Sequence, residues 1–122
     1  MTETKTETLP PAVSRWFDCW NSGVIDDLPI TDDFRHTSPF GTIETKARYL
    51  EIVNKNTDAF LGNKLTVLKQ IADGDKVCVQ FRQSRDDDPE FEMIVCEWYV
   101  LDRGRIKEIE SFYNIGDAVI EG

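Results

Sequence analysis

Two side chains of this sequence stand where they could carry out acid–base chemistry. Glu97 interrupts residues 93–101, which otherwise form the most apolar run of the chain. A carboxylate in apolar surroundings costs free energy unless it is hydrogen-bonded, paired or protonated, and shifted pKa values are common among catalytic acids. His36 is the only histidine, and histidine titrates near neutral pH. These two residues form the candidate catalytic pair.

The alternation of side chains along a strand decides where Glu97 points. One face of this strand carries Ile94, Cys96, Trp98 and Val100, and the other carries Met93, Val95, Glu97, Tyr99 and Leu101. If the first face covers the helices, Glu97 faces solvent and has no chemical role. If the second face covers them, Glu97 borders the interior. Both faces are apolar, so the pattern alone allows both interpretations.

His36 lies in a short expected strand, where it alternates with Phe34, Ser38 and Phe40. His36 and Ser38 are separated by roughly 6.5–7 Å along such a strand, which is too far for a direct hydrogen bond. They therefore form no nucleophilic pair, although both could contact one ligand. Alternatively, His36 is a partly buried residue hydrogen-bonded to a backbone carbonyl or to Glu97, and Ser38 is only a turn residue.

The composition limits the partners and compartments that are possible. The chain has 122 residues and a net charge of -9, which argues against nucleic acid or an anionic membrane as a partner. Its three cysteines fit no metal-ligand spacing, and their odd number indicates reduced thiols. No signal peptide, membrane span or cofactor motif is recognisable, so we expect a cytoplasmic protein without metal or cofactor.

The elements that would position these residues follow a simple order. Residues 1–9 form a polar tail that should be disordered, and residues 10–122 form a single domain. Two helices come first, from the proline pair at position 10 to Gly23 and from Thr45 to about position 57 or 60. Strands are expected at residues 64–72, 76–85, 91–101 and 105–115. The order predicts an α+β fold, with a cone-shaped, curved, mixed or antiparallel sheet wrapped around the N-terminal helices and enclosing a pocket.

Several short motifs carry a resemblance to a known superfamily. They are Arg15-Trp16 followed by Gly23, the segment at residues 37–41, and Glu97-Trp98-Tyr99 followed by Gly104. With the element order, they make the chain similar to the nuclear transport factor 2-like superfamily, in its SnoaL-like and ketosteroid isomerase-like branch. The resemblance implies a cone, with the side chains of both His36 and Glu97 pointing into its interior. Because this architecture hosts many activities, the resemblance indicates the fold rather than one reaction.

The isomerase chemistry carries over only in part. By position, the catalytic tyrosine of the isomerases falls on Trp16, their general-base aspartate on Ser38, and their hydrogen-bond-donating aspartate on Glu97. The usual proton shuttle would therefore lack its base. The Asp-Arg-Asp set of the related epoxide hydrolases is also not expected, since strand parity turns Arg82 away from the pocket.

The resemblance and the strand parity together define a candidate site. His36 is predicted as the base, and Glu97 as a raised-pKa acid or the partner that orients His36. The predicted ligand-binding residues are Trp16, Ser38, Phe40, Tyr49, Phe60, Gln83, Tyr99 and Tyr113. Tyr99 and Tyr113 could stabilise an oxyanion, and Ser111 shares their inward parity. Some of the aromatic residues could equally be core.

Three functions remain open from the sequence. The first is an isomerase- or cyclase-type enzyme that binds an apolar carbonyl compound and moves a proton. The second is a non-catalytic binding module with the same pocket, and the third is a dimeric interaction module with a filled cone. A homodimer is expected in each case, because Ile94, Trp98, Val100 and Phe112 would form a large apolar patch on the outer sheet face.

Overall fold

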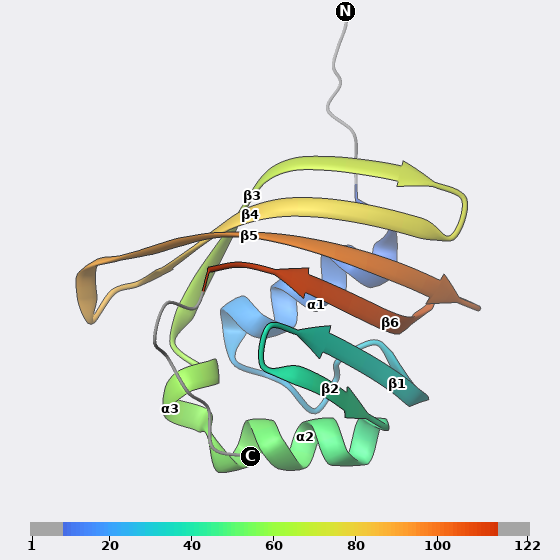
Figure 1. The fold of residues 1–122 in the computed structure, drawn as a ribbon, viewed down its shortest axis with the longest axis horizontal. Helices are drawn as coiled ribbons and strands as arrows, with labels where there is room; N and C mark the ends of the chain where they lie inside the picture. Colours follow the sequence, from blue (N-terminus) through green and yellow to red (C-terminus); the bar gives the residue numbers. More distant parts are fainter. Residues whose placement is uncertain (1–8, 115–122) are drawn as a thin grey trace, which may run out of the picture.

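The structure, a computed structural model, describes residues 9–114. The disordered tail predicted for residues 1–9 lies outside the described residues, apart from Leu9, which packs against the core. The described residues confirm the predicted α+β class, with helices on one side of a curled, unclosed sheet (Figure 1).

The sheet has six strands in the order β2-β1-β6-β5-β4-β3. Every neighbouring pair is antiparallel except β1 and β6, which run parallel. In chain order the elements are α1 (Pro11–Ser22), β1 (Ile30–Ser38), β2 (Gly41–Glu44), α2 (Lys46–Lys55), α3 (Thr57–Phe60), β3 (Asn63–Asp73), β4 (Lys76–Arg85), β5 (Asp88–Asp102) and β6 (Arg105–Phe112).

Helix α1 forms as its sequence predicts. A proline occupies its first turn, and Val13, Trp16, Phe17 and Trp20 are buried at helical spacing. Gly23 ends the helix with a positive φ of 82°, a conformation that glycine adopts without steric cost. The buried side of α1 packs against the inner face of the long strands, so this helix fills the centre of the cone.

The regions around the second helix differ from the prediction. Strand β1 begins at Ile30, and β2 returns beside it as a hairpin that the sequence did not reveal. The helix that starts after Thr45 divides at Asn56, whose backbone N–H and side-chain amide both donate to the Ile52 carbonyl. The short helix α3 follows, and Figure 1 shows α2 beside β1 and β2, with α3 at the end of α2 from which the chain continues into β3.

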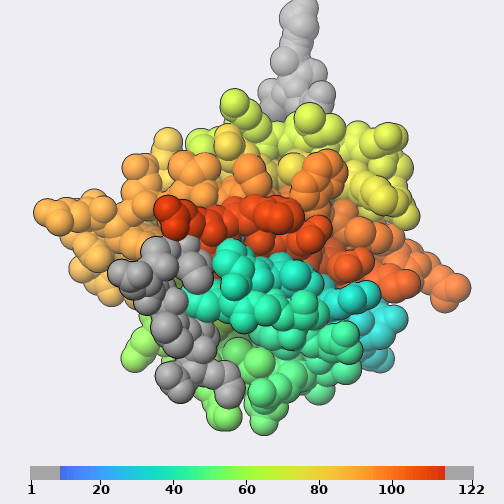
Figure 2. Space-filling view, in the orientation of Figure 1, coloured from blue at the N-terminus to red at the C-terminus, as the bar shows by residue number. Residues whose placement is uncertain are grey.

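The long strands have one buried face and one exposed face. Val77, Val79, Val95 and Tyr99 point toward α1 and are almost completely buried. Trp98 points to the opposite face and is 48% exposed. Figure 2 looks onto this opposite face, which is formed by β3 to β6. Glu97 therefore belongs to the inner face, and the solvent-facing interpretation of this residue is wrong.

Candidate functional site

The sheet register brings three polar side chains together. Glu97 on β5 lies directly opposite Ser111 on β6, and both side chains are buried, with exposed fractions of 7% and 3%. On the other side of β6, His36 of β1 lies opposite Ile109, two residues before Ser111. The parallel pairing of β1 with β6 thus places the only histidine beside the serine. His36 and Ser111, which meet in this cluster, are 75 residues apart in the chain.

A chain of hydrogen bonds joins His36 to Glu97 through Ser111. The Ser111 hydroxyl donates to Glu97 Oε2 at 2.7 Å, and His36 Nε2 lies 2.8 Å from Ser111 Oγ. The Tyr99 hydroxyl donates to the other carboxylate oxygen, Oε1. Both oxygens of the carboxylate are therefore satisfied, which is what a buried acid requires.

Burial shifts the two titratable groups in opposite directions. Desolvation raises the pKa of Glu97 above its ordinary value, and the hydrogen bonds from Tyr99 and Ser111 counteract part of this rise. Desolvation lowers the pKa of His36 from 6.5 to about 4. At neutral pH the imidazole is therefore uncharged and can accept a proton.

The hydrogen-bond directions assign the histidine tautomer. Since the Ser111 hydrogen is directed to Glu97, the serine oxygen accepts a hydrogen bond from His36 Nε2–H. Nδ1 is then the ring nitrogen that carries the free lone pair. The His36 ring stacks on Phe34 at 6.4 Å and meets the Tyr49 ring edge-on at 5.4 Å. These aromatic contacts hold the imidazole plane in place.

The cluster forms part of the wall of a cavity of about 490 Å³, a volume suited to a small organic molecule. The wall is mainly apolar and aromatic, and it includes Trp16, Trp20, Tyr49, Phe60, Leu65, Phe81, Met93 and Val95. Among the described residues that line it, His36 and Glu97 are the only ones that ionise near neutral or acidic pH, and no lysine or arginine takes part. The site thus combines an apolar wall with one acid–base cluster.

A family comparison matches residues 13–109 to the SnoaL-like domain. This chain belongs to the SnoaL-like domain family. Its fold is also the nuclear transport factor 2-like fold of many solved structures. A candidate polyketide cyclase from Sinorhizobium meliloti superimposes with a TM-score of 0.74 at 21% identity, covering 84% of this chain and 94% of that one.

Two further solved structures widen the range of named activities. A candidate ketosteroid isomerase from Kribbella flavida has a TM-score of 0.72 at 19% identity, covering 93% of this chain and 82% of that one. An LEH-like epoxide hydrolase from M. tuberculosis has a TM-score of 0.73 at 18% identity, covering 87% of this chain and 82% of that one. At these identities the likeness establishes the fold alone. A comparison with curated protein sequences finds no match.

The SnoaL-like domain brings most of the predicted site residues to the cavity. His36 and Glu97 line it together with Trp16, Phe40, Tyr49, Phe60, Gln83 and Tyr113. Ser38 does not line it: its hydroxyl accepts from the Phe40 backbone N–H at 3.2 Å, as a turn residue does. Tyr99 does not line it either, because its fully buried hydroxyl is bound to Glu97. Of the predicted ligand-binding residues, Ser38 and Tyr99 are thus the two that do not line this cavity.

Sequence reasoning missed two roles in this domain. It placed Ser111 on the inner face but did not find that Ser111 joins His36 to Glu97. It predicted Tyr49 as a ligand-binding residue but gave its hydroxyl no role, and this hydroxyl has no hydrogen-bond partner within residues 9–114. Burial and the nearby Glu97 raise the pKa of Tyr49 well above 10, so it remains a hydrogen-bond donor at every ordinary pH.

No group of three or more His, Cys, Asp or Glu residues in the described part of the chain is arranged to hold a metal ion. None of the helices in that part has the length and apolar character needed to cross a bilayer.

Proposed function

We propose that this SnoaL-like domain binds a small, mostly apolar carbonyl compound and moves a proton at the carbon next to the carbonyl. The observation that supports the proposal is the hydrogen-bonded chain His36–Ser111–Glu97 in the wall of an apolar cavity. A neutral imidazole beside an apolar space is a suitable base, and a buried carboxylate behind it can receive the proton.

The proton would enter at His36 and come to rest on Glu97. As Nδ1 takes a proton from the substrate carbon, the Nε2 proton passes to Ser111 Oγ, and the Ser111 proton passes to Glu97 Oε2. The imidazole then stays neutral with its tautomer exchanged, and the carboxylate becomes a carboxylic acid. This outcome agrees with the two pKa shifts, because burial disfavours the imidazolium and favours the protonated acid. Reversal of the steps returns the proton to a different substrate carbon.

The substrate electrons that remain after proton removal would be held as an enolate. Tyr49 is the best-placed donor for the enolate oxygen, since its hydroxyl is unpartnered among the described residues and its ring contacts His36. Tyr113 also lines the cavity, and a hydrogen bond with Ser38 partly counteracts the rise that burial causes in its pKa. In this proposal Tyr49 takes the role that the sequence assigned to Tyr99, and Tyr113 keeps the role predicted for it.

The proposal is testable with prodan, a fluorescent aromatic ketone that reports binding to an apolar site and carries exchangeable protons beside its carbonyl. In deuterium oxide, the protein is expected to accelerate exchange of these protons, measured by NMR. Ser111→Ala and Glu97→Gln should each slow this exchange on the order of a hundredfold, because the relay is interrupted. Both variants should still bind prodan, which its fluorescence measures.

Ser84→Ala is the matched control, since Ser84 of β4 lies outside the cavity wall, and this variant should leave exchange within about twofold of the parent. Equal exchange by the parent, Ser111→Ala and Glu97→Gln would contradict the relay. Tight prodan binding without any exchange would instead favour the second candidate function, a non-catalytic binding module. That candidate is supported by the position of Ser38, which replaces the base of the isomerases and does not reach the cavity.

A further inference from the structure

The cavity has a second polar position far from His36 and Glu97. Gln83 of β4 lines it, opposite Met93 of β5 on one side and Leu65 of β3 on the other. Met93 precedes Glu97 by four residues on the same strand. At the rise of a strand, Gln83 and Glu97 are therefore separated by roughly 13 Å along the sheet. The space between them is bordered by Val95 and Phe81, which are apolar.

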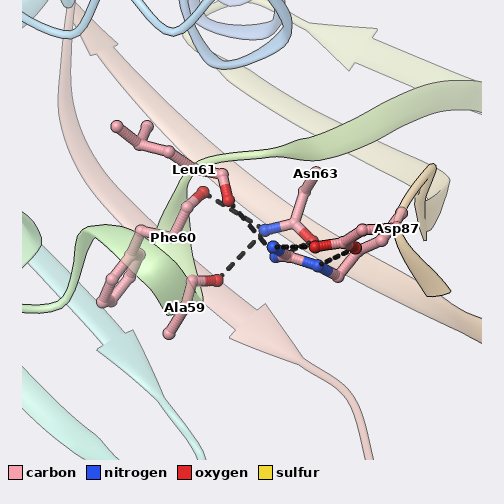
Figure 3. A network of polar contacts seen from close by, with 6 residues as sticks. Ala59, Phe60, Leu61, Asn63 and Asp87 are labelled. Carbon is pink, nitrogen blue, oxygen red and sulfur yellow. Dashed lines mark hydrogen bonds and ion pairs between the residues drawn. The ribbon is translucent and has the colours of Figure 1, made fainter.

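The Gln83 carboxamide is not used by the protein itself. Within residues 9–114 it makes no side-chain hydrogen bond, whereas neighbouring polar side chains are occupied. The Asn63 amide donates to the Ala59 and Phe60 carbonyls, and its oxygen accepts from Arg85, as part of the network in Figure 3. Gln80, on the other face of β4, donates to Cys96 Sγ. An amide that lines a cavity and lacks a protein partner is suited to a ligand.

The charge of the wall restricts what Gln83 could recognise. No lysine or arginine is among the described residues that line the cavity, and Glu97 is an acid. A carboxylate or phosphate would find no counter-charge and would be repelled by Glu97 once this residue is ionised. A carboxamide both donates and accepts, so it fits a neutral hydroxyl or a neutral carbonyl equally well.

We propose that the ligand is an elongated, uncharged molecule with an oxygen at each end. This inference rests on the proposed function, which places a carbonyl at the His36–Glu97 end. The second oxygen, a hydroxyl or carbonyl on the far ring or chain end, hydrogen-bonds the Gln83 amide. An apolar body of about two fused rings spans the distance between them, since each hydrogen bond adds roughly 3 Å. Gln83 is thus the residue that selects ligands by their far end.

The test compares three ligands that differ only at the far end. They are an acetylnaphthalene, its hydroxy derivative with the hydroxyl on the distant ring, and the matching carboxylate. Binding is measured by quenching of tryptophan fluorescence, because Trp16 and Trp20 line the cavity. The parent protein is expected to bind the hydroxy ketone on the order of tenfold more tightly than the plain ketone and to bind the carboxylate least.

Gln83→Leu keeps the side-chain size and removes the amide. It should lose the tenfold preference for the hydroxy ketone and should bind the plain ketone as well as the parent does. Gln80→Leu, on the outer face of the same strand, is the control and should keep the preference. Equal affinities of the parent for the hydroxy and plain ketones would overturn the inference. If proton exchange on the acetyl group persisted in that case, the proposed function would stand without it.

Discussion

At the scale of single residues, the partly buried His36 should make the stability of the protein depend on pH. The pKa of His36 is about 4 in the folded protein against 6.5 when exposed. Between these values the unfolded chain binds a proton that the folded protein does not. The stabilisation is therefore complete above pH 6.5 and is lost as the pH falls through 4, by about 3 kcal/mol in total. Glu97 acts with the opposite sign, because its raised pKa favours proton uptake by the folded form.

The measurement that separates the two residues is a series of urea unfolding curves between pH 7 and pH 4. The free energy of unfolding of the parent should fall more steeply toward acid than that of His36→Gln, which has no group to protonate there. Glu97→Gln should show the steepest fall, because it loses the opposing contribution. Parallel curves for the parent and His36→Gln would show that the folded protein protonates His36 at its ordinary pKa.

The sequence identified His36 and Glu97 because ionisable residues in apolar runs are conspicuous, and it placed both on the cavity. It could not identify the serine between them. The tight turn after β5 pairs Asp102 with Arg105, and an unbroken ladder from that turn would place Glu97 opposite Glu110. A register shift between Val100 and Leu101 moves Ser111 into this position instead. Such a bulge leaves no distinct signal in the residue types.

At the scale of elements, the junction between α3 and β3 is fixed to the end of β4. Arg85 donates to the Leu61 carbonyl at 3.2 Å and to Asn63 Oδ1 at 3.1 Å, and its Nε bonds to Asp87 at 3.0 Å. Asn63 holds the last turn of α3 in the same network (Figure 3). Because Phe60 and Asn63 line the cavity, this network positions one of its walls.

Gly62 should be essential to that junction. Its φ is +86°, and a Cβ there would lie 3.1 Å from the Arg85 guanidinium. Gly74 has a φ of +64° with nothing within 4 Å, so it is a matched control for backbone strain alone. Gly74→Ala should lower the free energy of unfolding by about 1 kcal/mol, and Gly62→Ala by clearly more. Chemical denaturation measures both, and prodan affinity should fall only in Gly62→Ala. Equal losses in the two variants would show that Arg85 moves away without cost.

Helices and strands were predictable where side-chain periodicity and a turn residue alone determine an element and its ends. Helix α1 and strand β4 follow from side-chain periodicity and from Gly23 and the turn before Lys76. The hairpin of β1 and β2 was missed because β2 is only four residues long and mostly exposed, so it shows no alternation. The division of the second helix occurs at Asn56, where the side-chain amide also donates to the Ile52 carbonyl, and the apolar periodicity does not reveal such a local bond.

At the scale of the whole molecule, the outer face of the sheet exposes large apolar side chains. Ile94, Trp98 and Phe112 are 46%, 48% and 51% exposed, and they lie on the neighbouring strands β5 and β6. Apolar groups gathered in this way favour a protein partner. We propose that the partner is a second copy of the chain, packed face to face.

The charges on this face support a particular arrangement of the two copies. Residues paired across strands share a face. Lys76 therefore accompanies Val100, and Lys69 accompanies Gln80, on the β3–β4 side. Glu108 and Glu110 occupy β6 on the other side of β5. A two-fold axis parallel to β5 would place the basic side of one copy over the acidic side of the other, whereas an axis across the strands would place like charges together.

Three substitutions test this arrangement. Trp98→Glu buries a charge at the centre of the proposed interface and should convert the dimer to a monomer, as measured by analytical ultracentrifugation. Glu110→Lys and Lys69→Glu should each weaken self-association several-fold, since they oppose like charges. A mixture of these two variants should restore opposite charges at both symmetric contacts and form a heterodimer. Val24→Glu, in the connection between α1 and β1 and 52% exposed, is the control and should leave the dimer intact. A Trp98→Glu protein of unchanged mass in solution would exclude this face as the interface, and homodimers alone in the mixture would exclude the proposed axis.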